Sequence, residues 1–188
     1  MFRASVRFFL FICAASQAYG ATDYEIRPGT LIGFSYMVAG VPFYGTFVIK
    51  QSKFSIDFKN PENSTLALEF DTTKSTAGFY LATKAMLGDT ILDSRNHPTI
   101  NFFSTDIALA DGQFLLVGMA TIKGITDRIE ITVYLGKKIE TYRKAPQEIS
   151  FLFNTSFSRE KFRANGFSKL VGDTIELRDE VILYLKKE

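Results

Sequence analysis

The sequence has few of the side chains that carry covalent or metal chemistry. Its 188 residues include one cysteine, one histidine and no tryptophan. The histidine, His97, precedes Pro98 where we expect a turn leading into a strand, so a turn or surface role explains it better than a catalytic triad. One histidine and one cysteine, Cys13, are too few for an ordinary zinc site. We therefore expect no catalytic residue and no bound metal.

Motifs for cofactors and nucleophiles are also missing. No glycine-rich phosphate loop opens a helix, no nucleophile elbow is present, and the aspartates at 71 and 89–93 lack the spacing of a calcium loop. None of the 20 acidic residues stands out as part of a paired carboxylate site. The sequence thus predicts a protein that is not an enzyme and uses no cofactor. An enzyme is the alternative, although the sequence offers no candidate catalytic site for it.

The first twenty residues have the features of a cleavable secretory signal. Arg3 and Arg7 precede the apolar run Phe8 to Ala15, which is shorter than the ~20 residues that span a bilayer. A retained anchor is the alternative. We expect one domain over residues 21–188. Without Arg3 and Arg7, the 22 basic residues of the whole chain fall to 20, which equals the number of acidic residues. This neutral domain, without a cysteine, is expected to form no disulfide and to bind no nucleic acid.

Apolar and polar residues alternate with a period of two along most of the domain, which also contributes most of the 19 phenylalanines. This alternation is typical of strands with one buried face. Strands are predicted over residues 32–38, 45–50, 56–58, 65–71, 99–107, 113–122, 128–136, 149–158, 174–178 and 180–186. Turn residues separate them at Asn60-Pro61, Asp111-Gly112, Gly136-Lys137 and Gly172-Asp173.

One segment around residues 77–88 has helical spacing instead. Its apolar residues recur at Phe79, Ala82 and Met86, Thr76 is a candidate N-cap, and Gly88 is placed to end the helix. Regularly spaced strands with a single short helix predict an all-β protein, a closed or nearly closed antiparallel β-barrel of about eight strands. Alternation alone leaves open whether such a barrel is hollow or filled by side chains.

Four stretches of the sequence resemble the YceI-like family, also called the lipid- or polyisoprenoid-binding family. The most informative is the third of them, in which two strand-like pieces meet around Gly118 and Gly124. In chain order the four are Thr30-x-Ile32-x-Phe34-x-Tyr36 with Gly45-Thr46-Phe47; Asp93 with His97-Pro98-Thr99-Ile100-Asn101-Phe102-Phe103-Ser104-Thr105; Gly118-x-Ala120-Thr121-Ile122-x-Gly124-Ile125-Thr126; and Phe157-Ser158-Arg159-x-x-Phe162 with Leu170-Val171-Gly172-Asp173.

The resemblance implies a lipocalin-like barrel, secreted to the periplasm, that holds a long isoprenoid or quinone-type lipid without a covalent bond. In the family register, Ile100, Phe102 and Ser104 face inward, which leaves Phe103 against the helix or on the outer surface. Arg159 is expected to stabilise the barrel, with contact to a lipid headgroup as the alternative. The residues expected to line the lipid tunnel are Phe34, Tyr36, Phe47, Leu68, Phe70, Ile100, Phe102, Ile131 and Phe153; ordinary core packing is the rival explanation for each.

Three functions therefore compete at this point. The first is a periplasmic carrier of a hydrophobic chain molecule, with transient membrane contact for lipid exchange and a homodimer as further expectations. The second is an enzyme that acts on a lipid or quinone in the same cavity, which would need a polar cluster inside the barrel. The third is a structural or interaction module with a filled barrel.

Overall fold

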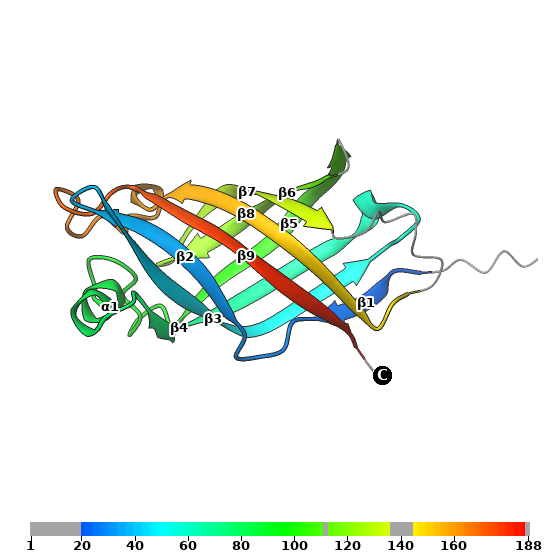
Figure 1. Ribbon diagram of the computed structural model, residues 1–188, viewed down its shortest axis with the longest axis horizontal. Helices are drawn as coiled ribbons and strands as arrows, with labels where there is room; N and C mark the ends of the chain where they lie inside the picture. Colours follow the sequence, from blue (N-terminus) through cyan, green and yellow to red (C-terminus); the bar gives the residue numbers. More distant parts are fainter. Residues whose placement is uncertain (1–19, 111–112, 136–144, 187–188) are drawn as a thin grey trace, which may run out of the picture.

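The computed structural model describes residues 20–110, 113–135 and 145–186. In these ranges the chain is almost entirely β-structure with one short α-helix (Figure 1). The strands are β1 (Thr22–Glu25), β2 (Leu31–Val38), β3 (Val41–Ile56), β4 (Thr65–Thr76), β5 (Thr99–Ala110), β6 (Gln113–Ile122), β7 (Ile125–Leu135), β8 (Glu148–Ser158) and β9 (Thr174–Leu185). The helix is α1 (Tyr80–Leu87), and the 3-10 turns are η1 (Pro61–Asn63) and η3 (Glu160–Phe162).

The strands form one antiparallel sheet that closes into a barrel. Its order is β1-β3-β2-β9-β8-β7-β6-β5-β4, and closure comes from pairing of β3 with β4. Strands β1 and β2 share one position in the barrel, because each of them pairs with both β3 and β9. Strand β2 lies beside the first half of β3, and β1 lies beside the end of β3. The barrel therefore has eight strand positions, and the predicted all-β barrel with one helix is confirmed.

The alternation seen in the sequence determines which side chains point into the barrel. Along β2, Ile32, Phe34 and Tyr36 are buried, whereas Leu31 and Met37 are exposed. Each such side chain contributes about 1.5–3 kcal/mol when it is fully buried. The interior is therefore built from alternate residues of every strand, and phenylalanines supply much of it.

A β-bulge changes the register of β5. The pairing with β6 shifts between Ser104 and Asp106. Before the bulge Phe102 is buried and Phe103 is 48% exposed, as the family register predicts; after it, Ile107 is the next buried residue. Ser104 is half-buried, and its hydroxyl accepts a hydrogen bond from the main-chain N–H of Leu66 at 2.9 Å.

The β6–β7 hairpin closes through two residues, Lys123 and Gly124, with φ of 51° and 73°. Positive φ at both positions is the backbone of a type I′ turn, which suits glycine. A side chain at Gly124 would also meet the ring of His97, since an added Cβ would lie 2.9 Å from its Cε1. The Thr121 and Thr126 hydroxyls, 2.8 Å apart, hold the register beside the turn.

Some boundaries differ from the prediction. Thr76 is not the N-cap, because it ends β4; Phe79 occupies that position without a side-chain cap, while Gly88 does end the helix. Residues 45–50 and 56 belong to the single strand β3, and residues 174–178 and 180–185 to β9. The short β1 was not predicted. Residues 1–19 of the secretory signal expected over residues 1–20, and the turns predicted at 111–112 and 136–137, lie outside the described residues.

Candidate functional site

The barrel interior is partly hollow. Within the described residues it contains two apolar cavities, of about 190 Å³ and about 280 Å³. The smaller, cavity 1, extends toward η1 and the start of β4, where Pro61, Ser64 and Thr65 line it. The larger, cavity 2, lies at the end that carries α1, the β2–β3 hairpin and the loop between β8 and β9 (Figure 1, left). Each exceeds the ~150 Å³ of an engineered apolar cavity that binds benzene.

The two cavities adjoin, because they share part of their lining. Four residues line both of them, and we call these four the neck: Phe47, Ile100, Ile122 and Phe157. The Phe47 ring stacks on that of Phe34 with centroids 4.4 Å apart, and Phe157 meets Phe162 edge to face at 5.8 Å. A chain molecule long enough to occupy both cavities would have to pass between these side chains.

All nine residues predicted to line a tunnel lie on the inner wall. Phe34 and Tyr36 line cavity 2, Phe47 and Ile100 belong to the neck, and Leu68, Phe70, Phe102, Ile131 and Phe153 line cavity 1. Leu68 and Ile131 are half-buried, and the other seven are buried. The structure thus brings the nine residues together around one interior; their contact with a ligand stays a prediction.

Two neck residues were not in that predicted set. Ile122 is the last residue of β6, and Phe157 is near the end of β8. Both continue the period-two alternation of their strands, and Phe157 opens the motif Phe157-Ser158-Arg159. The signal that could have identified them was therefore present, but their place between two cavities depends on strands that meet only in the closed barrel.

Cavity 2 contains two polar side chains, and both bond to the main chain. The Tyr36 hydroxyl donates to the carbonyl of Ala77 at 2.8 Å, and burial raises the pKa of this phenol above its ordinary value. Arg159 is only 4% exposed. Its Nε donates to Gly172 at 2.9 Å, and its two terminal nitrogens donate to the carbonyls of Ala164, Gly166 (3.0 Å) and Val171 (2.8 Å).

Arg159 therefore organises the loop between β8 and β9. Burial lowers the pKa of its guanidinium, while the charges of Asp173 and Glu160 act in the opposite direction. Burial alone would raise the pKa of the Asp173 carboxyl, but hydrogen bonds from the Ser158 hydroxyl and the Glu160 N–H, with the nearby cations, lower it. With its donors directed at four loop carbonyls, Arg159 has the structural role that the sequence favoured.

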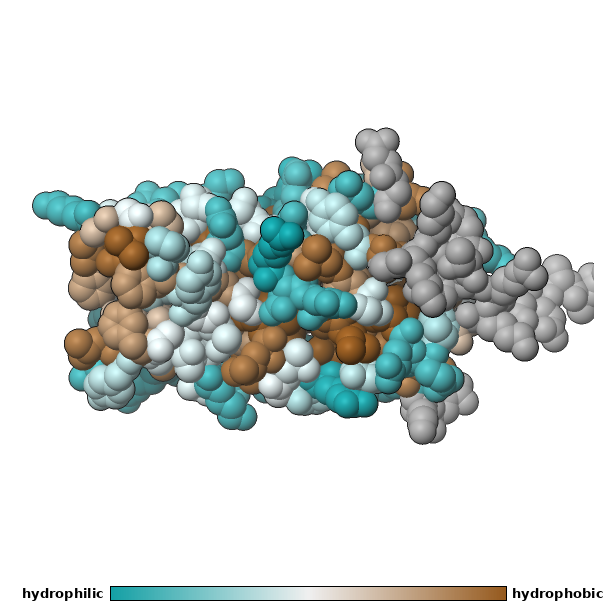
Figure 2. Space-filling view, viewed as in Figure 1, coloured by the Kyte–Doolittle hydropathy of each residue, from teal (hydrophilic) through white to brown (hydrophobic). Residues whose placement is uncertain are grey.

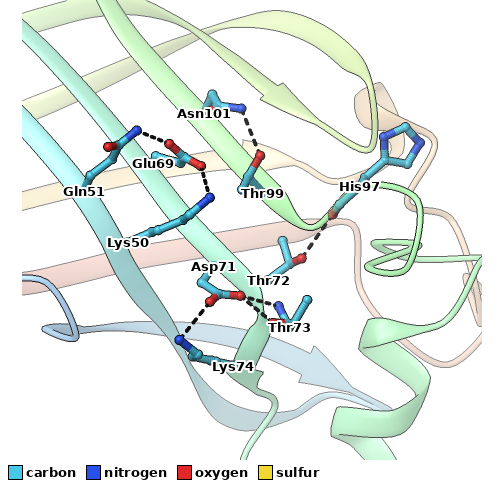
Figure 3. A network of polar contacts seen from close by, with 10 residues as sticks. All are labelled: Lys50, Gln51, Glu69, Asp71, Thr72, Thr73, Lys74, His97, Thr99 and Asn101. Carbon is cyan, nitrogen blue, oxygen red and sulfur yellow. Dashed lines mark hydrogen bonds and ion pairs between the residues drawn. The ribbon is translucent and has the colours of Figure 1, made fainter.

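A network of polar contacts lies across β3, β4 and β5 (Figure 3). Lys50 contacts Glu69 at 2.7 Å, Gln51 also bonds to Glu69, and Asp71 accepts from the Thr73 hydroxyl at 2.6 Å. His97 joins this network only through its carbonyl, which accepts from the Thr72 hydroxyl at 3.0 Å. The half-buried imidazole instead packs on Gly124, as expected for a histidine at a turn.

The arrangement of the interior suits an apolar ligand. Apart from Ser64, Thr65 and Thr155, the side chains around cavity 1 are apolar. Among the residues that the structure describes, no group of three or more histidine, cysteine, aspartate or glutamate side chains is placed to hold a metal ion. In the same part of the chain, no helix has both the length and the apolar character needed to cross a membrane.

Comparisons with known proteins agree with this geometry. The sequence profile of the YceI-like domain matches residues 24–182. The fold is similar to BcnA of Burkholderia cenocepacia, with a TM-score of 0.70 and 16% identity over 81% of this chain and 94% of that one. The fold is also similar to a polyisoprenoid-binding domain from Saccharophagus degradans, implicated in plant cell wall breakdown. The TM-score is 0.61 and the identity 11%, over 88% of this chain and 99% of that one.

A further solved structure with this fold is the YceI protein of Campylobacter jejuni. It has a TM-score of 0.59 and 17% identity, over 77% of this chain and 82% of that one. No curated protein has a significant match to the sequence. At these identities the likeness to solved structures concerns the fold.

Proposed function

This chain belongs to the family of YceI-like domains, and we propose that it binds a long hydrophobic lipid, of the polyisoprenoid or isoprenoid-quinone type, inside its barrel. The observation that carries the proposal is the pair of apolar cavities joined at the neck. An apolar chain gains about 0.8 kcal/mol for each CH₂ group that leaves water. A site of this kind needs few polar groups, because most of its affinity comes from burial.

The shape of the interior and the family membership support the proposed class of lipid. Two cavities in line along a barrel suit a long, flexible chain better than a compact ring system. The solved Saccharophagus degradans domain, which has the same fold, is described as binding polyisoprenoids. The proposed ligand therefore threads from cavity 2, past Phe47 and Ile100, into cavity 1.

The proposal also includes a non-catalytic role in the periplasm. Tyr36 and Arg159, the polar side chains of cavity 2, bond to main-chain carbonyls, so the proposal assigns them to the scaffold and requires no cofactor. Export is proposed because residues 1–20 have the features of a secretory signal. Sequencing the N-terminus of exported protein tests this part separately; a first residue near Ala21 supports it, and retention of the apolar run contradicts it.

Mass spectrometry of bound lipid tests the central claim. The mature protein is purified without detergent and extracted with organic solvent, and we expect a long isoprenoid in the extract. Phe102→Asn places an amide against the apolar wall of cavity 1 and should abolish retention. Phe103→Asn, the neighbouring residue on the outer face of the same strand, is the matched control and should retain the lipid.

A second inner-wall variant keeps the test independent of folding. Leu68 lines cavity 1 but is only half-buried, so Leu68→Gln is expected to fold and to bind less lipid. Circular dichroism confirms the fold of each variant. Recovery of no lipid from the wild type, and no uptake of added undecaprenol, would overturn the proposal and favour an interaction module.

A further inference from the structure

The mouth of cavity 2 is surrounded by three segments that are distant in the sequence but joined in the structure. The β2–β3 hairpin bonds to the loop before β9, because Ala39 N–H donates to the Leu170 carbonyl at 2.8 Å and Gly172 N–H to Met37 at 2.9 Å. Gly166 N–H in this loop donates to Thr90, just after α1, at 3.0 Å. Aromatic contact between Phe43 and Phe79, 5.8 Å apart, links α1 back to the hairpin.

This ring, which we call the collar, exposes large apolar side chains from all three segments. Figure 2 shows the corresponding brown surface at the end of the molecule where Figure 1 places α1 and the β2–β3 hairpin. Tyr80 is 76% exposed and Leu81 70% exposed. The exposed apolar residues of the collar are Met37 and Val41 on the hairpin, Phe79, Tyr80 and Leu81 at the start of α1, and Phe167 and Leu170 in the loop before β9.

The collar is continuous with the cavity beneath it. Phe79, Leu81, Phe167 and Leu170 line cavity 2, and each of them is also about half exposed or more. The apolar interior therefore reaches solvent through an apolar rim. A large exposed apolar patch of this kind marks an interaction surface.

Cations predominate among the charged side chains of the collar. Residues 37–46, 77–88 and 161–172 contain no aspartate or glutamate, although the whole chain has 20 of them. The same three segments carry Lys84, Lys161, Arg163 and Lys169, and all four side chains are exposed. Lys161 pairs with Asp127 on β7 at 3.5 Å. The exposed acidic residues Asp89, Glu160 and Asp173 border these segments in the sequence, so Lys84, Arg163 and Lys169 lie beside the apolar side chains and the carboxylates lie at the segment ends.

We propose that the collar inserts its apolar side chains into the surface of an anionic phospholipid bilayer, with the mouth of cavity 2 facing the membrane. Apolar side chains at the centre and cations beside them are the combination that binds such an interface, since burial and attraction to anionic headgroups act together. A second copy of the chain would bring like charges together at the same surface. The route of a lipid through this mouth rests on the proposed function, whereas the docking itself does not.

Vesicle flotation tests the docking with two matched pairs of substitutions. Val41→Ser with Tyr80→Ser removes two exposed collar residues that line neither cavity. Leu109→Ser with Leu115→Ser removes two exposed residues of the β5–β6 hairpin at the opposite end. We expect the wild type to float with phosphatidylglycerol vesicles, the collar variant to bind roughly tenfold more weakly, and the hairpin variant to bind as the wild type does.

Two further measurements identify the contributions of charge and insertion. Lys84→Gln with Lys169→Gln should weaken binding to phosphatidylglycerol by ~10-fold and reduce its dependence on salt. Because the chain has no tryptophan, Tyr80→Trp provides a single tryptophan, which can be excited selectively at wavelengths that tyrosine does not absorb. We expect its emission to shift to the blue on vesicles and to be quenched by brominated lipid, while Leu109→Trp at the far end responds to neither.

The outcomes separate the docking from the proposed function. Loss of flotation in the collar variant, with lipid still recovered when it is loaded from organic solution, supports the docking. Absence of wild-type binding to vesicles, or equal loss in the collar and hairpin variants, overturns it even if the barrel contains lipid. A dimer in sedimentation that the collar substitutions dissociate, without vesicle binding, overturns it in favour of a second copy.

Discussion

Blocking the neck should divide the interior into two short sites. Ile100 lies on β5 and lines both cavities, so Ile100→Phe places a larger side chain at their boundary. A long polyprenol would then occupy cavity 2 alone, whereas a short isoprenoid alcohol such as geraniol would still fit there. Ile100→Val leaves the boundary open and is the matched control.

The size of the effect follows from the volume that the ligand loses. Cavity 1 measures about 190 Å³. Since ~150 Å³ accommodates a benzene molecule, cavity 1 holds at least about six carbons of the chain. At ~0.8 kcal/mol for each carbon and ~1.4 kcal/mol for each factor of ten, the loss of about six carbons would weaken binding by ~3,000-fold. Ordering of the chain reduces this gain, so a loss of about 100-fold is expected.

Competition against a fluorescent fatty-acid analogue measures both affinities. We expect Ile100→Phe to weaken undecaprenol binding and to leave geraniol binding within about threefold of the wild type. Thermal unfolding should show a stability loss of about 1–3 kcal/mol, as usual for an overpacked core. Equal loss of both ligands, or unchanged binding of undecaprenol, would refute a ligand that threads the neck.

Three stability predictions follow from the scaffold. Arg159→Gln leaves buried loop carbonyls without donors and should cost ~3 kcal/mol or more in urea unfolding, whereas Arg178→Gln on the exposed face of β9 should cost less than ~0.5 kcal/mol; a loss below ~1 kcal/mol for the first contradicts its role. Gly118→Ala places a Cβ 2.4 Å from a phenylalanine ring and from a main-chain oxygen, so the melting temperature should fall well below that of Gly33→Ala, where the nearest atom is 3.5 Å away. Equal melting temperatures would show that the ring can move aside. The hydrogen bond from the Thr73 hydroxyl lowers the pKa of the Asp71 carboxyl; burial opposes this shift and Lys74 adds to it. The stability that ionised Asp71 contributes is therefore fully present above the pKa of the unfolded chain, ~3.9, and is lost as the pH falls through the lower pKa of the folded protein. Asp71→Asn should therefore destabilise the protein by less than ~1 kcal/mol at pH ~7 and not at all at pH ~2, and a difference that persists in acid contradicts this origin.

Much of the architecture could be predicted because strand signals are local. Along β2 and β5 the alternation of Phe34, Tyr36, Ile100 and Phe102 with polar or small residues identifies the inner face, and the structure buries all four. The same local logic fails where strands are irregular. The bulge in β5 and the short β1 depend on partner strands, and β3 continues through residues 51–55, between the two strands predicted over 45–50 and 56–58.

The candidate site divides along the same line. By itself, the sequence determined a β-barrel, the residues on its inner wall, the helix ending at Gly88 and the family to which the barrel belongs, because these rest on spacing between near neighbours. Only the tertiary structure decided that the barrel is partly hollow, that Phe47 and Phe157 share a neck, and that Arg159 binds four loop carbonyls. The volume left between inner walls depends on how eight strand positions close around a common axis. The collar likewise depends on three segments that are distant in the sequence and meet at one end of the barrel. The alternation of residues along single strands predicts neither the interior volume nor this meeting of segments.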